Sequence, residues 1–239
     1  MISVKKNEFI RGLYAGIPIC LGYLSVSFAF GIFAVESGLS VLGTLLISMS
    51  CVTSAGQLAA VPIIAGGGGL VELAVSQLVI NLRYSLMSIS LSQKLDNTVK
   101  LFDRFAIAFV NTDEVFAVAS SQRSVSKWFM YGLMLTPWLG WSAGTLLGAA
   151  AGNILPSLVT SSLGIAIYGM FIAIVVPEAK RSRPTAICAG IAIFLSCLFY
   201  YLPVLQAIPS GFTVIICAVA ASAIMAAVAP IEQEVEANA

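Results

Sequence analysis

The sequence predicts an all-α, polytopic membrane protein with about seven or eight transmembrane segments of roughly 20 apolar residues each. Hydrophobic residues make up 59% of the 239 residues, charged residues make up only 10%, and the mean hydropathy is +0.98. Soluble domains usually contain about 25% charged residues. The apolar runs are also continuous, whereas the strands of a membrane barrel alternate apolar and polar residues. Both observations favour membrane-spanning helices.

The composition disfavours several classes of function. A net charge of +1 gives no basic patch for nucleic acid, and the absence of histidine removes the commonest proton relay and metal ligand. No GxxxxGK[ST] motif for nucleotide binding is present. We therefore expect no metal site, no cofactor and no enzyme activity. The cysteines lack any CxxC spacing and lie in apolar runs, as buried small hydrophobes do: Cys20, Cys51, Cys188, Cys197 and Cys217.

The first apolar run covers about residues 12–35 and follows the basic residues Lys5, Lys6 and Arg11. It has no small-residue cleavage site, so we expect a retained helix, not a signal peptide. Pro18 removes one backbone hydrogen bond and favours a kink. Four glycines allow a second helix to approach closely: Gly12, Gly16, Gly22 and Gly31.

The second run, Leu39–Ile64, is interrupted by the Ser-Ala-Gly-Gln sequence at Ser54–Gln57 and contains Pro62. Either one helix continues through it or the helix is broken or re-entrant. Non-helical backbone at membrane depth is tolerated only where it faces protein or a water-filled cavity. The flexible turn Gly66–Gly69 follows.

The third run, Leu70–Ser92, carries Asn81 and Arg83 in its middle. Residues two positions apart in a helix point roughly 200° apart around its axis, so these two side chains do not share a face. An unpaired arginine at the centre of a membrane helix costs about 2.5–3.5 kcal/mol. We therefore expect Arg83 to pair with Asp113 or Glu114, unless it binds the carboxylate of a substrate.

The fourth run, Phe105–Ser120, has Asn111, Thr112, Asp113 and Glu114 at its centre. Sixteen residues are short for a span, so this run is a tilted short span, a pair of half-helices or a boundary with both carboxylates in water. Because the chain has no histidine, Asp113 or Glu114 is the natural proton carrier.

The remaining chain predicts four more runs and an acidic tail within a single membrane domain, 1–239. They cover about 128–152, 156–176, 185–202 and 211–229, and the tail is 231–239. The first and fifth runs share a Gly-Leu pair, a proline and a Gly-aromatic pair. This pattern predicts repeats at 12–120 and 128–229, meeting at a central site as in many secondary transporters.

Basic loops face the cytoplasm, so Lys5, Lys6 and Arg11 predict a cytoplasmic N-terminus. For the same reason, the basic loop Glu178–Pro184 is predicted to lie in the cytoplasm. Eight full spans satisfy both loops but put the basic loop Gln93–Arg104 on the wrong side. Re-entrant second and fourth runs remove the conflict. Both topologies remain open.

Four motifs in this order resemble the AzlC family of bacterial branched-chain amino-acid export permeases. They are the Gly-Ile-Pro start, the Ser-Ala-Gly-Gln break, INLRYSL and NTDEVFA. The resemblance implies an amino-acid substrate, a bacterial cytoplasmic (inner) membrane location and a small AzlD-type membrane subunit as partner. The family motifs fall on Gln57, Asn81, Arg83, Asp113 and Glu114. Tyr84 departs from the histidine of many members.

These observations together predict a secondary transporter that exports branched-chain or other hydrophobic amino acids. The alternative is a channel or a structural membrane subunit of a larger complex. We expect the lipid bilayer and an amino acid as partners, and no nucleic acid. Asp113 and Glu114 are expected to couple transport to protons or ions. The expected substrate-binding residues are Gly56, Gln57, Asn81, Arg83 and Asn111.

Overall fold

The computed structural model describes residues 2–152, 154–155, 169, 172 and 175–229. Within these residues the fold is all-helical, and the only extended pairing is an isolated bridge between Leu95 and Val125. The predicted class of a polytopic helical membrane protein is confirmed. Four of the described helices are long and apolar enough to cross a membrane: Lys5–Glu36, Leu70–Ser92, Arg183–Tyr201 and Gly211–Val228.

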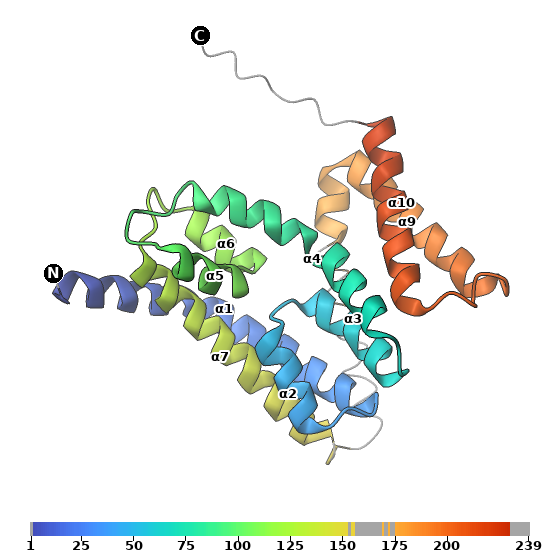
Figure 1. Cartoon of the computed structure of the whole chain (residues 1–239), viewed down its shortest axis with the longest axis horizontal. Helices are drawn as coiled ribbons and strands as arrows, with labels where there is room; N and C mark the ends of the chain where they lie inside the picture. The colour runs from blue at the N-terminus through green and yellow to red at the C-terminus, as the bar shows by residue number, and fades with distance from the viewer. Residues whose placement is uncertain (1, 153, 156–168, 170–171, 173–174, 230–239) are drawn as a thin grey trace, which may run out of the picture.

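Figure 1 shows the helices in the order in which they follow along the chain. They are α1 (Ile2–Glu36), α2 (Val41–Ser50), α3 (Ser54–Ala65), α4 (Leu70–Ser92), α5 (Leu101–Phe109), α6 (Asp113–Ser120), α7 (Lys127–Gly152), α9 (Arg183–Tyr201) and α10 (Ser210–Val228). Residues 175–181 are also helical. The expected sixth run and the acidic tail lie mostly outside the described residues.

Helices α1 and α7 lie side by side and run in the same direction (Figure 1). The contacts advance in the same direction along both helices, from Gly12 of α1 against Phe129 of α7 to Phe28 of α1 against Gly148 of α7. A Cβ atom at either glycine would overlap a backbone carbonyl oxygen of the other helix. The two backbones therefore touch, which only small residues permit. The same is true at Gly31, Gly132, Gly140 and Gly144.

The second apolar run is broken, as one of the two predicted alternatives. The break occupies Cys51–Thr53, just before the Ser-Ala-Gly-Gln sequence, which forms the first turn of α3. Helix α2 runs back along α7, because Trp138 Nε1 donates to the Met49 carbonyl at 3.1 Å. Helix α3 then runs back to the end of the molecule at which α2 begins. The α2–α3 pair is thus a re-entrant hairpin.

The fourth run is broken in the same way, between α5 and α6 at Val110–Thr112. Helix α5 begins beside the start of α7, where the Tyr131 hydroxyl donates to Asp103. Helix α6 ends at the same level, where Lys94 Nζ donates to the Ser120 carbonyl. The α5–α6 pair is a second re-entrant hairpin, and it enters from the opposite end of the molecule to the first.

Two hydrogen bonds decide at which end of the molecule the loop Gln93–Arg104 lies. Asp96 N donates to the Val125 carbonyl at 3.0 Å, and Ser126 Oγ bonds to Glu8 Oε2 at 3.3 Å. This loop therefore lies at the same end as the start of α1, as in the re-entrant topology and not in the one with eight full spans. We call this end the basic end, after Lys5, Lys6, Arg11, Lys94, Lys100, Arg104, Arg123 and Lys127, and the end with Gly66–Gly69 the distal end.

The units α1–α3 and α4–α6 have the same order, a long helix followed by a re-entrant hairpin, and they run in opposite directions (Figure 1). The sequence echoes this arrangement with Ile-x-Leu-x-Tyr at 19–23 in α1 and at 80–84 in α4. Thr53 and Thr112 are the N-cap residues of α3 and α6. The predicted repeat of 12–120 with 128–229 stays a prediction, because part of its second half lies outside the described residues.

The expected seventh and eighth runs are α9 and α10, which pack together and touch α3 and α4 through α10 (Figure 1). Glu72 Oε1 accepts a hydrogen bond from Gly211 N at 2.9 Å. A buried carboxylate thereby satisfies a free N–H group in the first turn of α10, where the helix dipole favours negative charge. This contact fixes the start of α10 at the distal end.

Gly148→Ala tests the contact between α1 and α7. The new methyl group would overlap the Phe28 carbonyl oxygen, so the two helices must separate. We expect a loss of about 1–3 kcal/mol, the usual cost of overpacking, and a lower melting temperature in detergent. The control is Gly152→Ala one turn later, whose Cβ atom would lie 3.4 Å from Ile32. Equal melting temperatures for the two variants would contradict close backbone contact.

Candidate functional site

The tips of the two hairpins meet at a central cavity of about 720 Å³. Its wall consists of Pro18, Ile19, Gly22, Tyr23 and Val26 from α1, Val52, Ser54 and Ala55 from the first hairpin, Arg83 and Tyr84 from α4, Thr112, Asp113 and Glu114 from the second hairpin, and Trp141 from α7. Polar groups therefore come from α4 and the hairpins, whereas α1 and α7 supply mostly apolar surface.

Both hairpins present a helix N-terminus to this cavity. Ser54 is the first residue of α3, and Asp113 is the first residue of α6. The Thr112 side chain caps α6 by accepting a hydrogen bond from Val115 N at 3.4 Å. Helix N-termini carry free N–H groups and a partial positive charge. The backbone alone therefore makes the cavity favourable for an anionic group.

Arg83 forms a two-pronged ion pair with Asp113. The distances are 2.7 Å from Nη2 to Oδ2 and 2.9 Å from Nη1 to Oδ1. The guanidinium also donates to the Tyr84 hydroxyl at 2.9 Å and lies over its ring. Of the two carboxylates expected to pair with Arg83, Asp113 is the one that forms the ion pair. The Arg83 side chain is 54% exposed and that of Asp113 is 46% exposed, so both still face the cavity.

Glu114 is held from the other side by Tyr23. The Tyr23 hydroxyl is hydrogen-bonded to Glu114 Oε2 at 2.5 Å and to Thr112 Oγ1 at 2.7 Å. The Tyr23 ring meets Trp141 edge to face, with centroids 5.0 Å apart. Helix α1 is thus tied to the tip of the second hairpin, and the two adjacent carboxylates of that tip have different partners.

Three of the expected substrate-binding residues, Gly56, Gln57 and Asn81, lie behind the cavity wall. Gln57 is fully buried, and its Nε2 atom donates to the Cys51 carbonyl in the helix break. Asn81 donates to Gln77 Oε1 at 3.2 Å, and Gln77 in turn donates to the Gly56 carbonyl at 2.9 Å. Asn81 and Gln77 therefore fix α4 against α3, whereas Gln57 joins α3 to the break within the first hairpin. The role of Gly56, Gln57 and Asn81 as substrate contacts stays a prediction.

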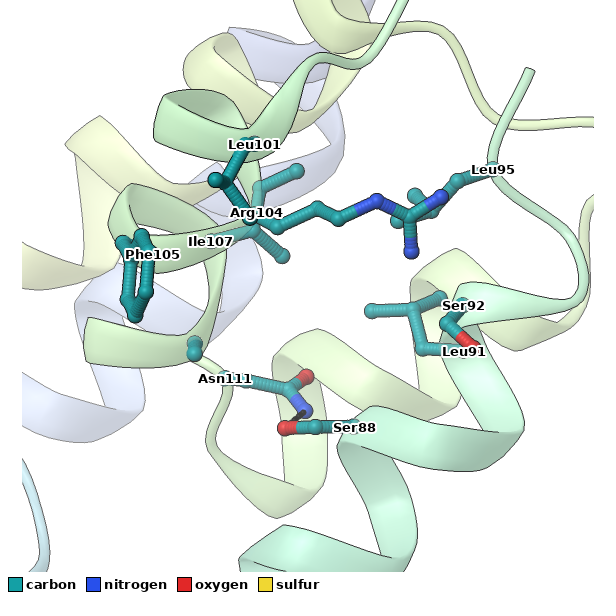
Figure 2. Close-up of a pocket in the computed structure, with 10 residues that line it drawn as sticks. Ser88, Leu91, Ser92, Leu95, Leu101, Arg104, Phe105, Ile107 and Asn111 are labelled. Carbon is teal, nitrogen blue, oxygen red and sulfur yellow. Dashed lines mark hydrogen bonds between the residues drawn. The ribbon is translucent and has the colours of Figure 1, made fainter. Parts of the chain in front are cut away.

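Asn111, another of the expected substrate-binding residues, lines a smaller cavity of about 270 Å³ between α4 and α5 (Figure 2). Its Nδ2 atom donates to Ser88 Oγ at 3.2 Å. The structure therefore brings Arg83, Asp113 and Glu114 together at one cavity and places Asn111 at another.

Tyr23, Tyr84 and Trp141 line the cavity but are not among the residues expected to bind substrate. The repeated Ile-x-Leu-x-Tyr motif was the signal that could have found the tyrosines, since both line the cavity from the two long helices of the inverted units. Trp141 also had a signal, because it is the aromatic residue of the Gly-aromatic pair that the fifth run shares with Gly22-Tyr23 of the first.

A second polar cluster fixes α5 to α7 at the basic end. The buried Asp103 accepts hydrogen bonds from the Tyr131 hydroxyl and from Lys100 N, the latter at 2.7 Å. These two bonds, with a smaller contribution from Lys127 at 3.8 Å, hold the pKa of Asp103 below its ordinary value. The stabilisation is present above the ordinary pKa and is lost as the pH falls through the lowered one.

No group of three or more His, Cys, Asp or Glu side chains in the described part of the chain is arranged to hold a metal ion. The central cavity instead combines one ion pair, one further carboxylate, two helix N-termini and apolar walls. This arrangement suits a small molecule with both charges and an apolar part.

A sequence model of the AzlC protein family matches residues 18–155. The chain belongs to the AzlC protein family. The match includes α1 from Pro18 onward, both hairpins, α4 and α7, so it contains every residue that lines the central cavity. No solved structure matches the chain significantly.

Three relatives illustrate the spread of the AzlC family. An uncharacterized membrane protein of Archaeoglobus fulgidus is 32% identical over 82% of this chain and 88% of its own. The inner membrane protein YgaZ of Escherichia coli is 27% identical over 77% of this chain and 78% of its own. The branched-chain amino acid transport protein AzlC of Bacillus subtilis is 25% identical over 77% of this chain and 74% of its own.

A pair of single variants and their combination test the ion pair. Arg83→Gln and Asp113→Asn each leave one charge without its partner, so each should lower the melting temperature. The double variant should lose less than the sum, with a coupling of about 0.5–3 kcal/mol. Arg123→Gln, an exposed arginine that lines neither cavity, is the control for loss of one positive charge. Strict additivity would show that the two side chains do not stabilise each other.

Proposed function

We propose that this protein is a secondary transporter that exports branched-chain or other hydrophobic amino acids, and that the central cavity is its substrate site. The observation that carries the proposal is the combination of Arg83, Asp113 and Glu114 with apolar walls in one cavity between two broken helices. Membership of the AzlC family, in which the Bacillus subtilis relative is named for branched-chain amino acid transport, supports the substrate class.

The cavity offers a partner for each part of such a substrate. The carboxylate is bound by the Arg83 guanidinium and the helix N-termini of α3 and α6. The ammonium group is bound by Asp113. The aliphatic side chain packs against Ile19, Val26 and Trp141, which lie on the apolar wall. A substrate without one of the two charges leaves a cavity charge unsatisfied and binds more weakly.

The two carboxylates are also the proposed coupling groups. Export against a gradient requires an energy source, and the chain has neither histidine nor a GxxxxGK[ST] motif. Asp113 is paired with Arg83, whereas Glu114 accepts only from the neutral Tyr23 hydroxyl among its described side-chain partners. Glu114 therefore takes up and releases the proton, and Asp113 orients Arg83.

The opposed hairpins support transport by alternating access. In transporters built from inverted repeats, broken helices meet at the substrate site, and each half moves against the other. Here the Tyr23 hydroxyl ties α1 to the tip of the second hairpin, and Arg83 ties α4 to the same tip through Asp113. Breaking these contacts frees the tip of the second hairpin to move and so opens the cavity alternately to the two sides.

The proposed location is the bacterial cytoplasmic membrane, with the basic end in the cytoplasm. Helices α9 and α10 form a hairpin whose α10 begins at the distal end, so α9 begins on the side of the basic end (Figure 1). Lys180, Arg181 and Arg183 then join the other basic residues. The proposed partner is a small AzlD-type membrane subunit.

Transport in everted membrane vesicles tests this function. Radiolabelled valine should accumulate in vesicles that contain the protein and its AzlD-type partner, and an uncoupler should abolish accumulation. Glu114→Gln should reduce accumulation at least tenfold while leaving exchange of valine across the membrane, because only proton coupling is lost. The control is Glu36→Gln, an exposed carboxylate at the end of α1.

Accumulation that resists both the uncoupler and Glu114→Gln would contradict proton coupling through this residue. Flux that follows the gradient without saturation would instead support a channel. Background efflux of every amino acid tested, with both subunits present, would contradict the proposed function itself.

A further inference from the structure

The smaller cavity lies between the C-terminal half of α4 and α5, near the basic end (Figure 2). Its walls are largely apolar and include Leu91, Leu95 and Ile107. Arg104 extends from α5 across the cavity, as Figure 2 shows. Among the described residues, this guanidinium has neither an ion-pair nor a hydrogen-bond partner. The cavity thus has one unneutralised positive charge on one side.

The opposite side of the cavity has an unsatisfied acceptor. Asn111 is only 3% exposed, and its Nδ2 atom is used by Ser88. Its Oδ1 atom is buried and has no hydrogen-bond partner among the described residues. In Figure 2 this oxygen lies on the side of the amide group that faces away from Ser88. Buried polar atoms are almost always hydrogen-bonded, so this oxygen calls for a donor from a bound molecule.

These three features define the ligand. A positive charge needs an anionic group, a buried acceptor needs a donor, and the apolar wall beside them needs an aliphatic group. We propose that this cavity is a second binding site for a zwitterionic aliphatic amino acid. Its carboxylate binds Arg104, its ammonium group donates to Asn111 Oδ1, and its side chain packs against Leu91 and Ile107.

The position of the site gives it a role. Asn111 directly precedes Thr112 and Asp113, which line the central cavity. The tip of the second hairpin therefore separates the two cavities, and the smaller one lies towards the basic end. A substrate held here waits beside the segment that must move to admit it to the central cavity. This role rests on the proposed function, whereas the binding site itself is measurable without transport.

The test is the stoichiometry of binding to the purified full chain in nanodiscs of phosphatidylcholine. Equilibrium dialysis with radiolabelled leucine should find two sites per chain. Arg83→Gln should remove the central site and leave one. Adding Arg104→Gln to that variant should weaken the remaining site about ten- to hundredfold, the effect of losing a hydrogen bond to a charged group. Asn111→Ala should weaken the same site, and Arg104→Lys should restore part of the affinity.

Arg123→Gln, which removes an exposed arginine at the same end, should leave both sites unchanged. Melting temperatures of all variants show that they are folded. A single site in the wild type, abolished by Arg83→Gln, would overturn the second site and leave the proposed function intact. Retention of the remaining site in the Arg104→Gln background would also overturn it. Displacement of leucine from this site by anionic lipid alone, and not by valine, would assign the cavity to a lipid. Absence of any leucine binding to the wild type would contradict the proposed function as well.

Discussion

In the described part of the chain, the helical backbone is interrupted twice within apolar runs, at Cys51–Thr53 and at Val110–Thr112. The free polar groups at both breaks must find partners that lipid cannot supply. At the first break, Gln57 donates to the Cys51 carbonyl, and Trp138 donates to the Met49 carbonyl. At the second, the Thr112 side chain accepts from Val115 N. Both breaks therefore have to be enclosed by protein. The parallel α1–α7 pair and α4 enclose them (Figure 1), and the central cavity lies where the two breaks meet.

The same constraint explains why charged residues gather here. An arginine in the middle of α4 is costly in lipid, but beside Asp113 and the hairpin tips it is paired and partly hydrated. Tyr23 binds Glu114 from α1 while Arg83 binds Asp113 from α4, so each long helix is tied to the tip of the same hairpin. Movement of that tip would change the surroundings of both carboxylates at once. This physical link connects the fold to the proposed coupling of substrate and proton.

Much of this could be predicted from the sequence, because hydrophobicity and the cost of buried charge act locally. The helical class and a carboxylate partner for Arg83 followed from those two quantities, and a broken second run was one of the two alternatives that they left open. The exact position of the first break did not, since it depends on Gln57 folding back onto Cys51. Nor did the placement of Asn81 and Asn111, because which face of a helix meets a cavity is decided by packing between elements distant in sequence. The inverted relation of α1–α3 to α4–α6 was missed because its echo is only Ile-x-Leu-x-Tyr and a capping threonine.

The two opposed hairpins are the central claim, and side-specific labelling tests them most directly. Single cysteines are introduced by Asn7→Cys, Gly69→Cys and Asn97→Cys into a chain without its native cysteines; all three positions are exposed. A membrane-impermeant maleimide is then added to sealed vesicles of known orientation. The account predicts that positions 7 and 97 react from one side and position 69 from the other. Eight full spans would reverse this result, with position 69 on the side of position 7 and position 97 opposite, and that outcome would contradict the account.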